Sequence, residues 1–301
     1  MALPPTRRGR DYFLTAPKFL ILSPPKHGKT LLCATYSKFF EGWNRPDGAR
    51  FIELNDLLWV AFDPNAIVGL VEQGYDVPII DLSDKVGTAL LPALDDFDKE
   101  IVKRLEGHEK EHGAKLRALV VDTASFLDKN LNEWFGRLYS DPRDKFSSIG
   151  ERHTRIANRL KSLSPDVALF VLCHAKSDQP LKSDDVAGRA KERASGLPGS
   201  GGVSSALTGQ TKGTYEALVD GILPLCALEE QTIGPDKKPL NVLRRVLYPR
   251  GGNGFEGATR YMRFLDKEEP ADLGKMLAKI RSCWEKSLAQ APTPAIPAAA
   301  V

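Results

Sequence analysis

An eight-residue run constrains this chain more than any other feature: Ser23-Pro24-Pro25-Lys26-His27-Gly28-Lys29-Thr30. It follows the apolar segment Phe19–Leu22 and precedes a helix-like segment that starts at Leu31. A strand, a tight loop ending in Gly-Lys-Thr and a helix form the phosphate-binding P-loop, whose backbone N–H groups turn inward around phosphates. The strict pattern has Gly where this chain has Ser23. The interpretation therefore depends on the strand–loop–helix context, and the alternative is an ordinary strand-to-helix turn.

The P-loop interpretation assigns a role to each part of the run. Residues 23–31 are candidates for binding a nucleotide through their backbone and side chains. Lys29 is expected to reach the β- and γ-phosphates, and the Thr30 hydroxyl is expected to bind Mg²⁺. ATP and Mg²⁺ are therefore the expected cofactors.

Composition narrows the class of protein. The chain has 301 residues, of which 42% are hydrophobic and 27% charged, as in an ordinary soluble globular protein. A net charge of +3 excludes a global basic field, although a local basic patch is still compatible with it. No apolar run reaches the roughly 20 residues of a membrane span. The four cysteines are far apart and form no C-x-x-C pair, so we expect buried thiols in a reducing cytoplasm.

Strand-like and helix-like runs alternate along the chain. Strands are expected at 19–22, 57–62, 77–82, 118–122, 168–173, 221–228 and 242–248. Helices are expected at 29–40, 66–72, 90–109, 125–138, 149–163 and 271–288. The alternation predicts an α/β fold with a mostly parallel central sheet flanked by helices. The strands at 118–122 and 168–173 are apolar almost throughout, which is typical of strands covered on both faces.

The pattern also suggests a division of the chain. We expect an N-terminal arm at 1–17, one large domain at 18–265, a C-terminal helix at 266–290 and a disordered Ala/Pro-rich tail at 291–301. The glycine-rich stretch 176–214 interrupts the alternation. A loop of this length inside a compact domain is usually functional or mobile.

A second motif complements the P-loop. Leu119–Asp122 is an apolar strand that ends in a carboxylate, the Walker B form. Asp122 is expected to contact the metal shell next to Thr30, so both residues are candidate Mg²⁺ ligands. The alternative is a simpler role for Asp122 as the cap of a helix that starts near Ser125.

Further candidates follow the ends of other strands. His174 is placed to lie beside the γ-phosphate, and Asp63 to hold the attacking water. A surface histidine and an Asp-Pro-Asn turn are the plainer alternatives. Arg244, Arg245 and Arg250 cluster late in the chain. One of them is a candidate arginine finger for a neighbouring subunit, and the alternative is a solvated basic strand face.

Two further motifs are interpreted as coincidental. His108–His112 fits H-E-x-x-H, the zinc-protease pattern, but lies in the charged segment 106–115. We expect a solvated helix end there, without zinc, because that chemistry needs a buried face and a third ligand. Gly252–Gly257 fits G-x-G-x-x-G, but no helix-like segment follows it. A glycine-rich hairpin or loop is the better interpretation.

Taken together, these residues resemble the RecA-like ATPases of phages, of the single-strand-annealing recombination type. The resemblance covers roughly 18–265 and rests on four segments: Ser23–Thr30, Phe62–Pro64, Val120–Thr123 and Val171–Lys176. It implies a RecA-like P-loop NTPase core that hydrolyses Mg·ATP while acting on single-stranded DNA in recombination or replication. In that family a Glu after the second strand activates water. In this chain Asp63 falls near that place, so an Asp stands where the family has a Glu.

The resemblance also implies partners. The family's DNA-binding loop follows the strand that ends near His174, where the stretch 176–214 stands in this chain. The stretch offers six basic candidates for DNA phosphates but no aromatic residue for base stacking: Lys176, Lys182, Arg189, Lys191, Arg193 and Lys212.

Several functions remain open at this stage. Single-stranded DNA is the expected partner, with a homo-oligomer and a single-strand-binding protein as further ones, in the bacterial host cytoplasm if the chain is phage-encoded. One alternative is a nucleotide-dependent assembly or helicase-loading adaptor with little hydrolysis. A metabolic kinase is a third class, although no lid segment is evident.

Overall fold

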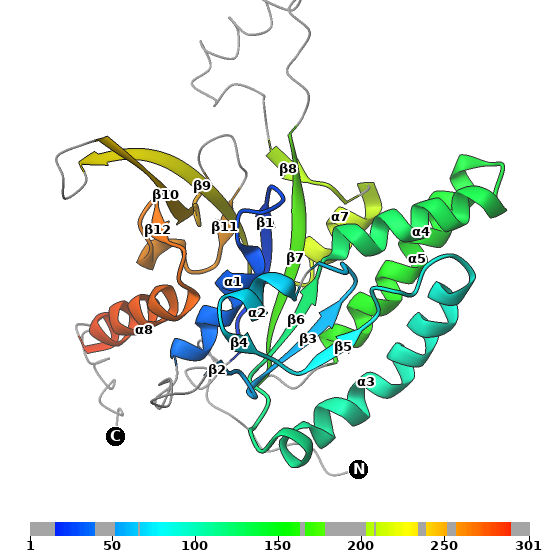
Figure 1. The fold of residues 1–301 in the computed structure, drawn as a ribbon, viewed down its shortest axis with the longest axis horizontal. Coiled ribbons are helices and arrows are strands. Elements are labelled where there is room, and N and C mark those ends of the chain that lie inside the picture. The colour runs from blue at the N-terminus through cyan, green and yellow to red at the C-terminus, as the bar shows by residue number, and fades with distance from the viewer. Residues whose placement is uncertain are drawn as a thin grey trace, which may run out of the picture.

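The computed structural model describes residues 16–39, 52–65, 67–162, 166–177, 203–207, 209–233, 239–251 and 257–289. At its centre lies a ten-stranded sheet (Figure 1). The order of the main path is β12 (Glu269–Pro270), β10 (Pro239–Leu247), β9 (Gly221–Ile233), β1 (Lys18–Ser23), β7 (Ala168–Ser177), β6 (Ala118–Asp122), β3 (Leu57–Ala61) and β5 (Ile79–Asp81). β11 (Ala258–Thr259) pairs with β9, and β8 (Val203–Ser205) pairs with β7. A separate small sheet joins β2 (Ile52–Glu53) and β4 (Tyr75–Asp76).

The central strands are parallel, and the edge beyond β9 is antiparallel. β1 pairs in parallel with both β7 and β9, and the parallel pairing continues through β6 and β3 to β5. β9 and β10 form a long antiparallel hairpin, and β12 extends it. The predicted α/β fold with a mostly parallel, helix-flanked sheet is therefore confirmed.

Side chains that alternate along each strand divide the core into two layers. Leu20 and Leu22 of β1 face one layer, whereas Phe19 and Ile21 face the other. The first layer is built with the helices α3 (Leu90–His112), α4 (Ala124–Leu138), α5 (Pro142–Lys161) and α7 (Gly209–Glu216). The second is built with α1 (Lys29–Ala34), the 3₁₀ turn Thr35–Phe39, α2 (Val68–Glu72) and α8 (Leu273–Ala289). Every residue of β3 and β6 is buried because helices cover both faces.

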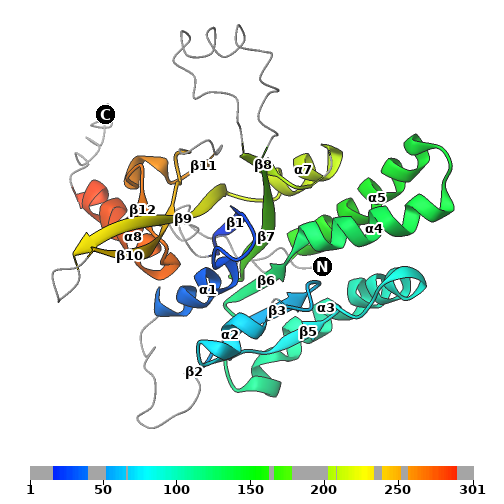
Figure 2. The same ribbon diagram turned by 45° about the horizontal axis from the view of Figure 1, so that its top comes forward.

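The two ends of the molecule carry different elements. β10, β12 and α8 lie at one end, and α3 lies at the other, in both views (Figures 1 and 2). The carboxyl ends of β1, β6 and β7 meet between these ends. This is the edge at which parallel α/β sheets bind ligands.

Several element boundaries differ from expectation. α5 begins at Pro142 instead of 149, because Asp141 caps it by accepting a 2.8 Å hydrogen bond from the Arg143 N–H and proline suits the first turn. The expected helix 29–40 changes to a 3₁₀ turn after Ala34. The C-terminal helix starts at Leu273, because β12 occupies part of the range expected for it.

The prediction of one long loop at 176–214 is wrong at both of its ends. β7 runs on to Ser177, β8 pairs with it, and α7 follows from Gly209 to Glu216. Residues 178–202 lie outside the described part of the chain, as do residues 1–15 of the expected arm at 1–17 and the expected tail at 291–301.

The histidine motif is only partly as expected. His112 ends α3. His108 is buried, and the Nε2–H of His108 donates a 2.7 Å hydrogen bond to the Asn55 carbonyl oxygen. The expectation of a solvated segment is therefore wrong for His108, whose pKa burial lowers. Within the described ranges, no three His, Cys, Asp or Glu side chains gather as metal ligands.

Two other findings bear on the expectations from composition. Cys33, Cys173 and Cys226 are buried, whereas Cys283 is only half-buried. No helix among the described residues has the length and apolar character needed to cross a membrane.

Candidate functional site

The P-loop is the turn between β1 and α1. β1 ends at Ser23 and α1 begins at Lys29, so Pro24–Gly28 form the connection. Lys26 and Gly28 have positive φ angles of 66° and 91°. A Cβ on Gly28 would lie 2.9 Å from Arg245 Nε, so both backbone and space favour glycine there. The Ser23 side chain, which stands where the strict motif has Gly, is buried and donates to the Pro24 carbonyl at 3.1 Å.

Lys29 folds back over its own loop. Its Nζ donates to the carbonyl oxygens of Ser23 and Pro24, at 3.3 Å each. The side chain is buried, and burial lowers its pKa, while the charge of Asp122 acts in the opposite direction. A phosphate oxygen would be a stronger partner for this ammonium group than either carbonyl, because the bond would join two charged groups.

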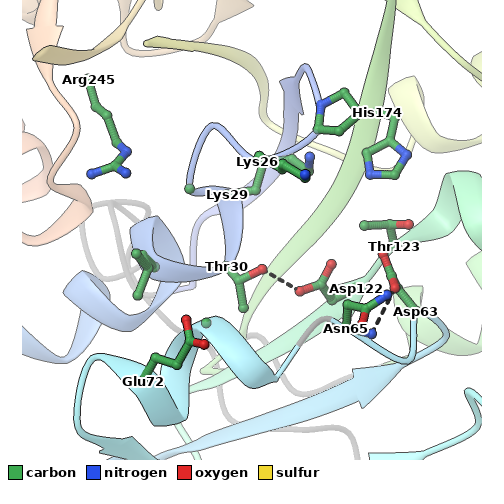
Figure 3. Close-up of a pocket in the computed structure, with 14 residues that line it drawn as sticks. Lys26, Lys29, Thr30, Asp63, Asn65, Glu72, Asp122, Thr123, His174 and Arg245 are labelled. Carbon is green, nitrogen blue, oxygen red and sulfur yellow. Dashed lines mark hydrogen bonds between the residues drawn. The ribbon is translucent and has the colours of Figure 1, made fainter. Parts of the chain in front are cut away.

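Thr30 and Asp122 join the two sequence motifs. The Thr30 hydroxyl donates to Asp122 Oδ2 at 2.7 Å, across 92 residues of sequence (Figure 3). The parallel register places Asp122 at the carboxyl end of β6, opposite Ala61 and Leu172 of the neighbouring strands. A hydroxyl and a carboxylate held together at a strand end are hard oxygen ligands of the kind that Mg²⁺ prefers.

The Asp122 carboxylate is poorly compensated by the protein alone. Only 2% of the residue is exposed, and burial raises its pKa to about 6, against the opposing effects of the Thr30 hydrogen bond and the Lys29 charge. A nearby dication would favour the ionised form, because opposite charges lower a carboxyl pKa. The donor set therefore fits a bound metal ion. The peptide bond that follows Asp122 is cis.

These groups line one pocket of about 690 Å³. Small-molecule sites typically measure roughly 300–1,000 Å³. The pocket is lined by residues of the P-loop, of the β3 and β6 ends, of α2 and of β10: Pro25, Lys26, Gly28, Lys29, Thr30, Leu31, Asp63, Asn65, Gly69, Glu72, Asp122, Thr123, His174 and Arg245. Figure 3 shows the labelled side chains around it.

The two other predicted catalytic residues are in this pocket. Asp63 lies beyond β3, and its Oδ1 accepts a 2.9 Å bond from the Asn65 N–H, so it forms the turn and also lines the pocket. The backbone N–H of His174 donates to Ser125 Oγ at 2.9 Å. Burial, with help from Lys29, lowers the pKa of His174, which keeps its imidazole neutral at neutral pH. The structure thus brings Lys29, Asp63, Asp122 and His174 together, while their roles stay predictions.

Arg244, Arg245 and Arg250 make different contacts in the structure. Arg245 lies against the P-loop of its own chain, where its Nε donates to the His27 carbonyl at 3.1 Å. Arg244 pairs with Glu268 at 3.2 Å, and Arg250 donates to the Met262 carbonyl at 2.8 and 3.1 Å. Only Arg245 of the three lines the described pocket.

Glu72 and Arg245 are two of the pocket residues whose position the sequence did not show. Glu72 lies on the short helix α2, where nothing distinguishes it from an ordinary surface acid. The role of Arg245 in its own chain depends on the β9–β10 pairing, which the sequence pattern did not specify.

The DNA-contact candidates are only partly described. Lys182, Arg189, Lys191 and Arg193 lie outside the described residues, and only the backbone of Lys176 is described, within β7. Lys212 lies on α7 with its Nζ 3.7 Å from a Glu216 oxygen. Most of the glycine-rich run 252–257 is also outside the described residues, and the short strand β11 follows it instead of a helix.

Comparison with known proteins adds little. No protein-family model matches the sequence, and no curated protein matches it. Among solved structures, the chain is similar to the flagellar accessory protein FlaH from Methanocaldococcus jannaschii, with 10% sequence identity over 77% of this chain and 76% of that chain, and a TM-score of 0.29. A similarity this low supports no argument about function. The chain itself shows a mostly parallel sheet with a Gly-Lys-Thr loop between β1 and α1.

Proposed function

We propose that this chain binds Mg·ATP in the pocket between β1, β6 and β10 and hydrolyses it. The observation that carries the proposal is the 2.7 Å hydrogen bond between Thr30 and Asp122, made in the same pocket as Lys29. Two motifs that are 92 residues apart have no packing reason to place a lysine, a hydroxyl and a carboxylate together in a pocket. Phosphate and a divalent cation supply such a reason.

Each side chain has a distinct role in this proposal. Lys29 binds phosphate oxygens in place of the Ser23 and Pro24 carbonyls. Thr30 and Asp122 hold Mg²⁺, which neutralises charge on the phosphates when bound. Asp63 orients the attacking water, and the neutral His174 hydrogen-bonds near the terminal phosphate.

Calorimetric titration with ATP in the presence of Mg²⁺ tests the proposal. Wild type should bind in the micromolar range or tighter, and Lys29→Ala should lose at least about tenfold in affinity, because a charge-assisted hydrogen bond contributes roughly 1.5–3 kcal/mol. Lys103→Ala is the matched control, because Lys103 is an exposed lysine on α3 paired with Glu100 at 2.9 Å. Equal ATP affinities in wild type and Lys29→Ala would rule out this pocket.

We also propose that ATP turnover is coupled to single-stranded DNA in a homo-oligomer, as in phage-type recombination or replication. Placement in the sequence supports the coupling. His174 lines the pocket, β7 ends at Ser177, and the basic stretch that follows returns to β7 through β8. A ligand bound between these strands would act on the strand that carries His174. An ATPase rate that single-stranded DNA leaves unchanged would favour the adaptor with little hydrolysis.

A further inference from the structure

Arg245 is fixed against the P-loop by the β9–β10 hairpin. In that hairpin Arg245 is paired with Ala227, and both residues reach the same loop residue. The Ala227 N–H donates to His27 Nδ1 at 3.0 Å, and Arg245 Nε donates to the His27 carbonyl at 3.1 Å. Gly28 leaves the space that the guanidinium occupies, because a Cβ there would meet Arg245 Nε at 2.9 Å. The two hydrogen bonds to His27 therefore join the hairpin to the P-loop and place the exposed Arg245 side chain beside it.

Arg245 lies at the end of the pocket that is farther from Asp122 and Asp63 (Figure 3). The groups suited to a metal ion and to water, Asp122 and Asp63, lie to one side of the P-loop, together with His174 (Figure 3). Arg245 and Glu72 lie on the other side (Figure 3). A nucleotide whose terminal phosphate lies toward Asp63 and the Thr30–Asp122 pair must extend its nucleoside toward Arg245.

We infer that Arg245 binds the nucleoside end of the nucleotide within its own chain and thereby distinguishes a nucleoside triphosphate from a bare phosphate chain. A guanidinium is suited to this task, because it offers five N–H donors in one plane and a flat face that stacks on aromatic rings. The hydrogen bond from Arg245 Nε–H to the His27 carbonyl oxygen orients the rest of the guanidinium group. The inference rests on the proposed function of the site.

The test compares two ligands that share their phosphates. Affinities for Mg·ATP and for inorganic tripolyphosphate with Mg²⁺ are measured by calorimetry on wild type, Arg245→Ala and Arg244→Ala. Arg244 is the matched control, because the adjacent arginine pairs with Glu268 outside the described pocket. Arg245→Ala should bind ATP about tenfold more weakly, in line with the loss of one charge-assisted contact. It should bind tripolyphosphate within twofold of wild type, and Arg244→Ala should change neither affinity.

Other outcomes overturn the inference. An equal loss for both ligands would mean that Arg245 acts on the phosphates or only shapes the P-loop through His27. No loss for either ligand would place Arg245 outside the site. A wild type that binds neither ligand contradicts the proposed function itself and is thereby distinguished from failure of the inference.

A mixing experiment tests whether Arg245 acts within its own chain. Lys29→Ala protein lacks the P-loop cation but keeps Arg245, whereas Arg245→Ala protein has the reverse defect. If Arg245 serves its own pocket, a mixture of the two should bind ATP no more tightly than Arg245→Ala alone. Tighter binding in the mixture would mean that Arg245 reaches the site of a neighbouring subunit, which would overturn the inference.

Discussion

The carboxylate of Asp122 is buried at a cost to the stability of the folded chain, and a bound cation would offset that cost. Its carboxylate is 2% exposed, and burial raises its pKa to about 6. A charge in such a place costs folding free energy unless it is compensated, and Lys29 and Thr30 compensate it only in part. The residue is therefore best explained by a ligand that supplies the missing positive charge.

Replacing Asp122 by Asn should raise the stability of the ligand-free protein and weaken its binding of a metal ion. The amide oxygen can still accept the Thr30 hydrogen bond, but the buried charge is gone. Without ligand at neutral pH, the variant should be more stable than wild type by about 1–3 kcal/mol, since one unit of pKa shift corresponds to about 1.4 kcal/mol. Urea unfolding measures this difference.

The same variant should lose most of the Mg²⁺-dependent part of ATP binding and hydrolysis. Glu100→Gln is the control, because Glu100 is an exposed acid of α3 that pairs with Lys103 at 2.9 Å and is not among the residues described as lining the pocket. A variant of Asp122 that is less stable than wild type and still responds to Mg²⁺ would make Asp122 a structural residue.

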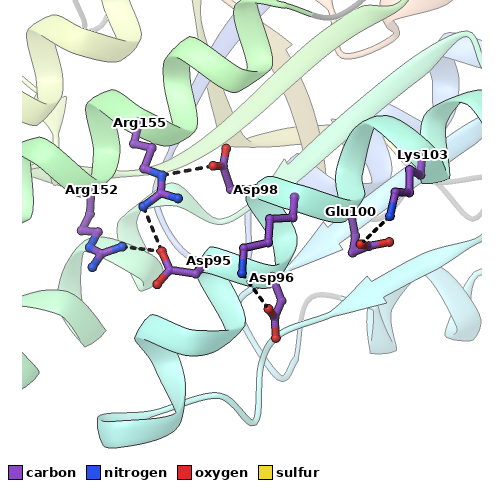
Figure 4. A network of polar contacts seen from close by, with 8 residues as sticks. Asp95, Asp96, Asp98, Glu100, Lys103, Arg152 and Arg155 are labelled. Carbon is purple, nitrogen blue, oxygen red and sulfur yellow. Dashed lines mark hydrogen bonds and ion pairs between the residues drawn. The ribbon is translucent and has the colours of Figure 1, made fainter.

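At the scale of elements, a network of ion pairs fixes α3 against α5. Arg152 and Arg155 of α5 both bind Asp95 of α3, at 2.7 and 3.0 Å (Figure 4). Asp98 accepts from Arg155 at 3.1 Å and from Arg159 at 2.9 Å, with 14% of its side chain exposed. These partners lower the pKa of Asp98, chiefly through the Arg159 hydrogen bond.

The network predicts a loss of stability in acid. A carboxyl whose pKa is lower in the folded state contributes stability above its unfolded pKa of 3.8, and that contribution is lost as the pH falls through the folded value. Asp98→Asn should therefore cost about 1–3 kcal/mol at pH 7 and progressively less below pH 4. Glu100→Gln, which affects only the exposed pair with Lys103, should cost less than about 0.5 kcal/mol. Urea unfolding across the pH range measures both, and equal costs for Asp98→Asn at pH 7 and pH 3 would contradict the assignment.

A contact between buried side chains fixes α7 against α5, and the sequence did not predict the helix α7. Tyr215 of α7 is fully buried, and its hydroxyl lies 3.1 Å from Nδ1 of the equally buried His153, whose Nε2 is 3.2 Å from Asp128. Tyr215→Phe should destabilise the protein by about 1–3 kcal/mol, because it leaves a buried ring nitrogen without its partner. Tyr139→Phe, at an exposed tyrosine after α4, should be neutral in the same thermal unfolding assay. Equal melting temperatures for the two variants would show that the contact contributes nothing.

The difference between predicted and missed elements has a physical reason. β6 was predicted to the residue, because a strand buried on both faces is a continuous apolar run with clear ends. α7 has the sequence GQTKGTYE, with two glycines and little apolar periodicity, so only the burial of Tyr215 and Thr211 reveals why it forms. In the same way, the motifs predicted that Lys29, Thr30 and Asp122 lie together in one pocket. Arg245 enters it through a hairpin pairing that local patterns do not specify.

At the scale of the whole molecule, the proposed coupling of ATP turnover to single-stranded DNA predicts how the affinity for DNA depends on salt. β7 is the element that would link the pocket to such a DNA site, since His174 lines the pocket and the strand ends three residues later at Ser177. The basic residues that follow favour phosphate contacts over base readout, because no aromatic residue accompanies them. Affinity for single-stranded DNA should therefore fall steeply with salt and vary little with base sequence.

The corresponding experiment replaces Arg189, Lys191 and Arg193 together by Ala and titrates fluorescent single-stranded DNA at several salt concentrations. Each lost phosphate contact should reduce the slope of log affinity against log salt by about 0.7, so the triple variant should bind more weakly with a slope flatter by roughly 2. Its ATP affinity should stay at the wild-type value if the stretch binds DNA and not the nucleotide. Unchanged slope and affinity would remove this stretch as the DNA site. A wild type that binds ATP but no DNA would instead favour the assembly or helicase-loading adaptor.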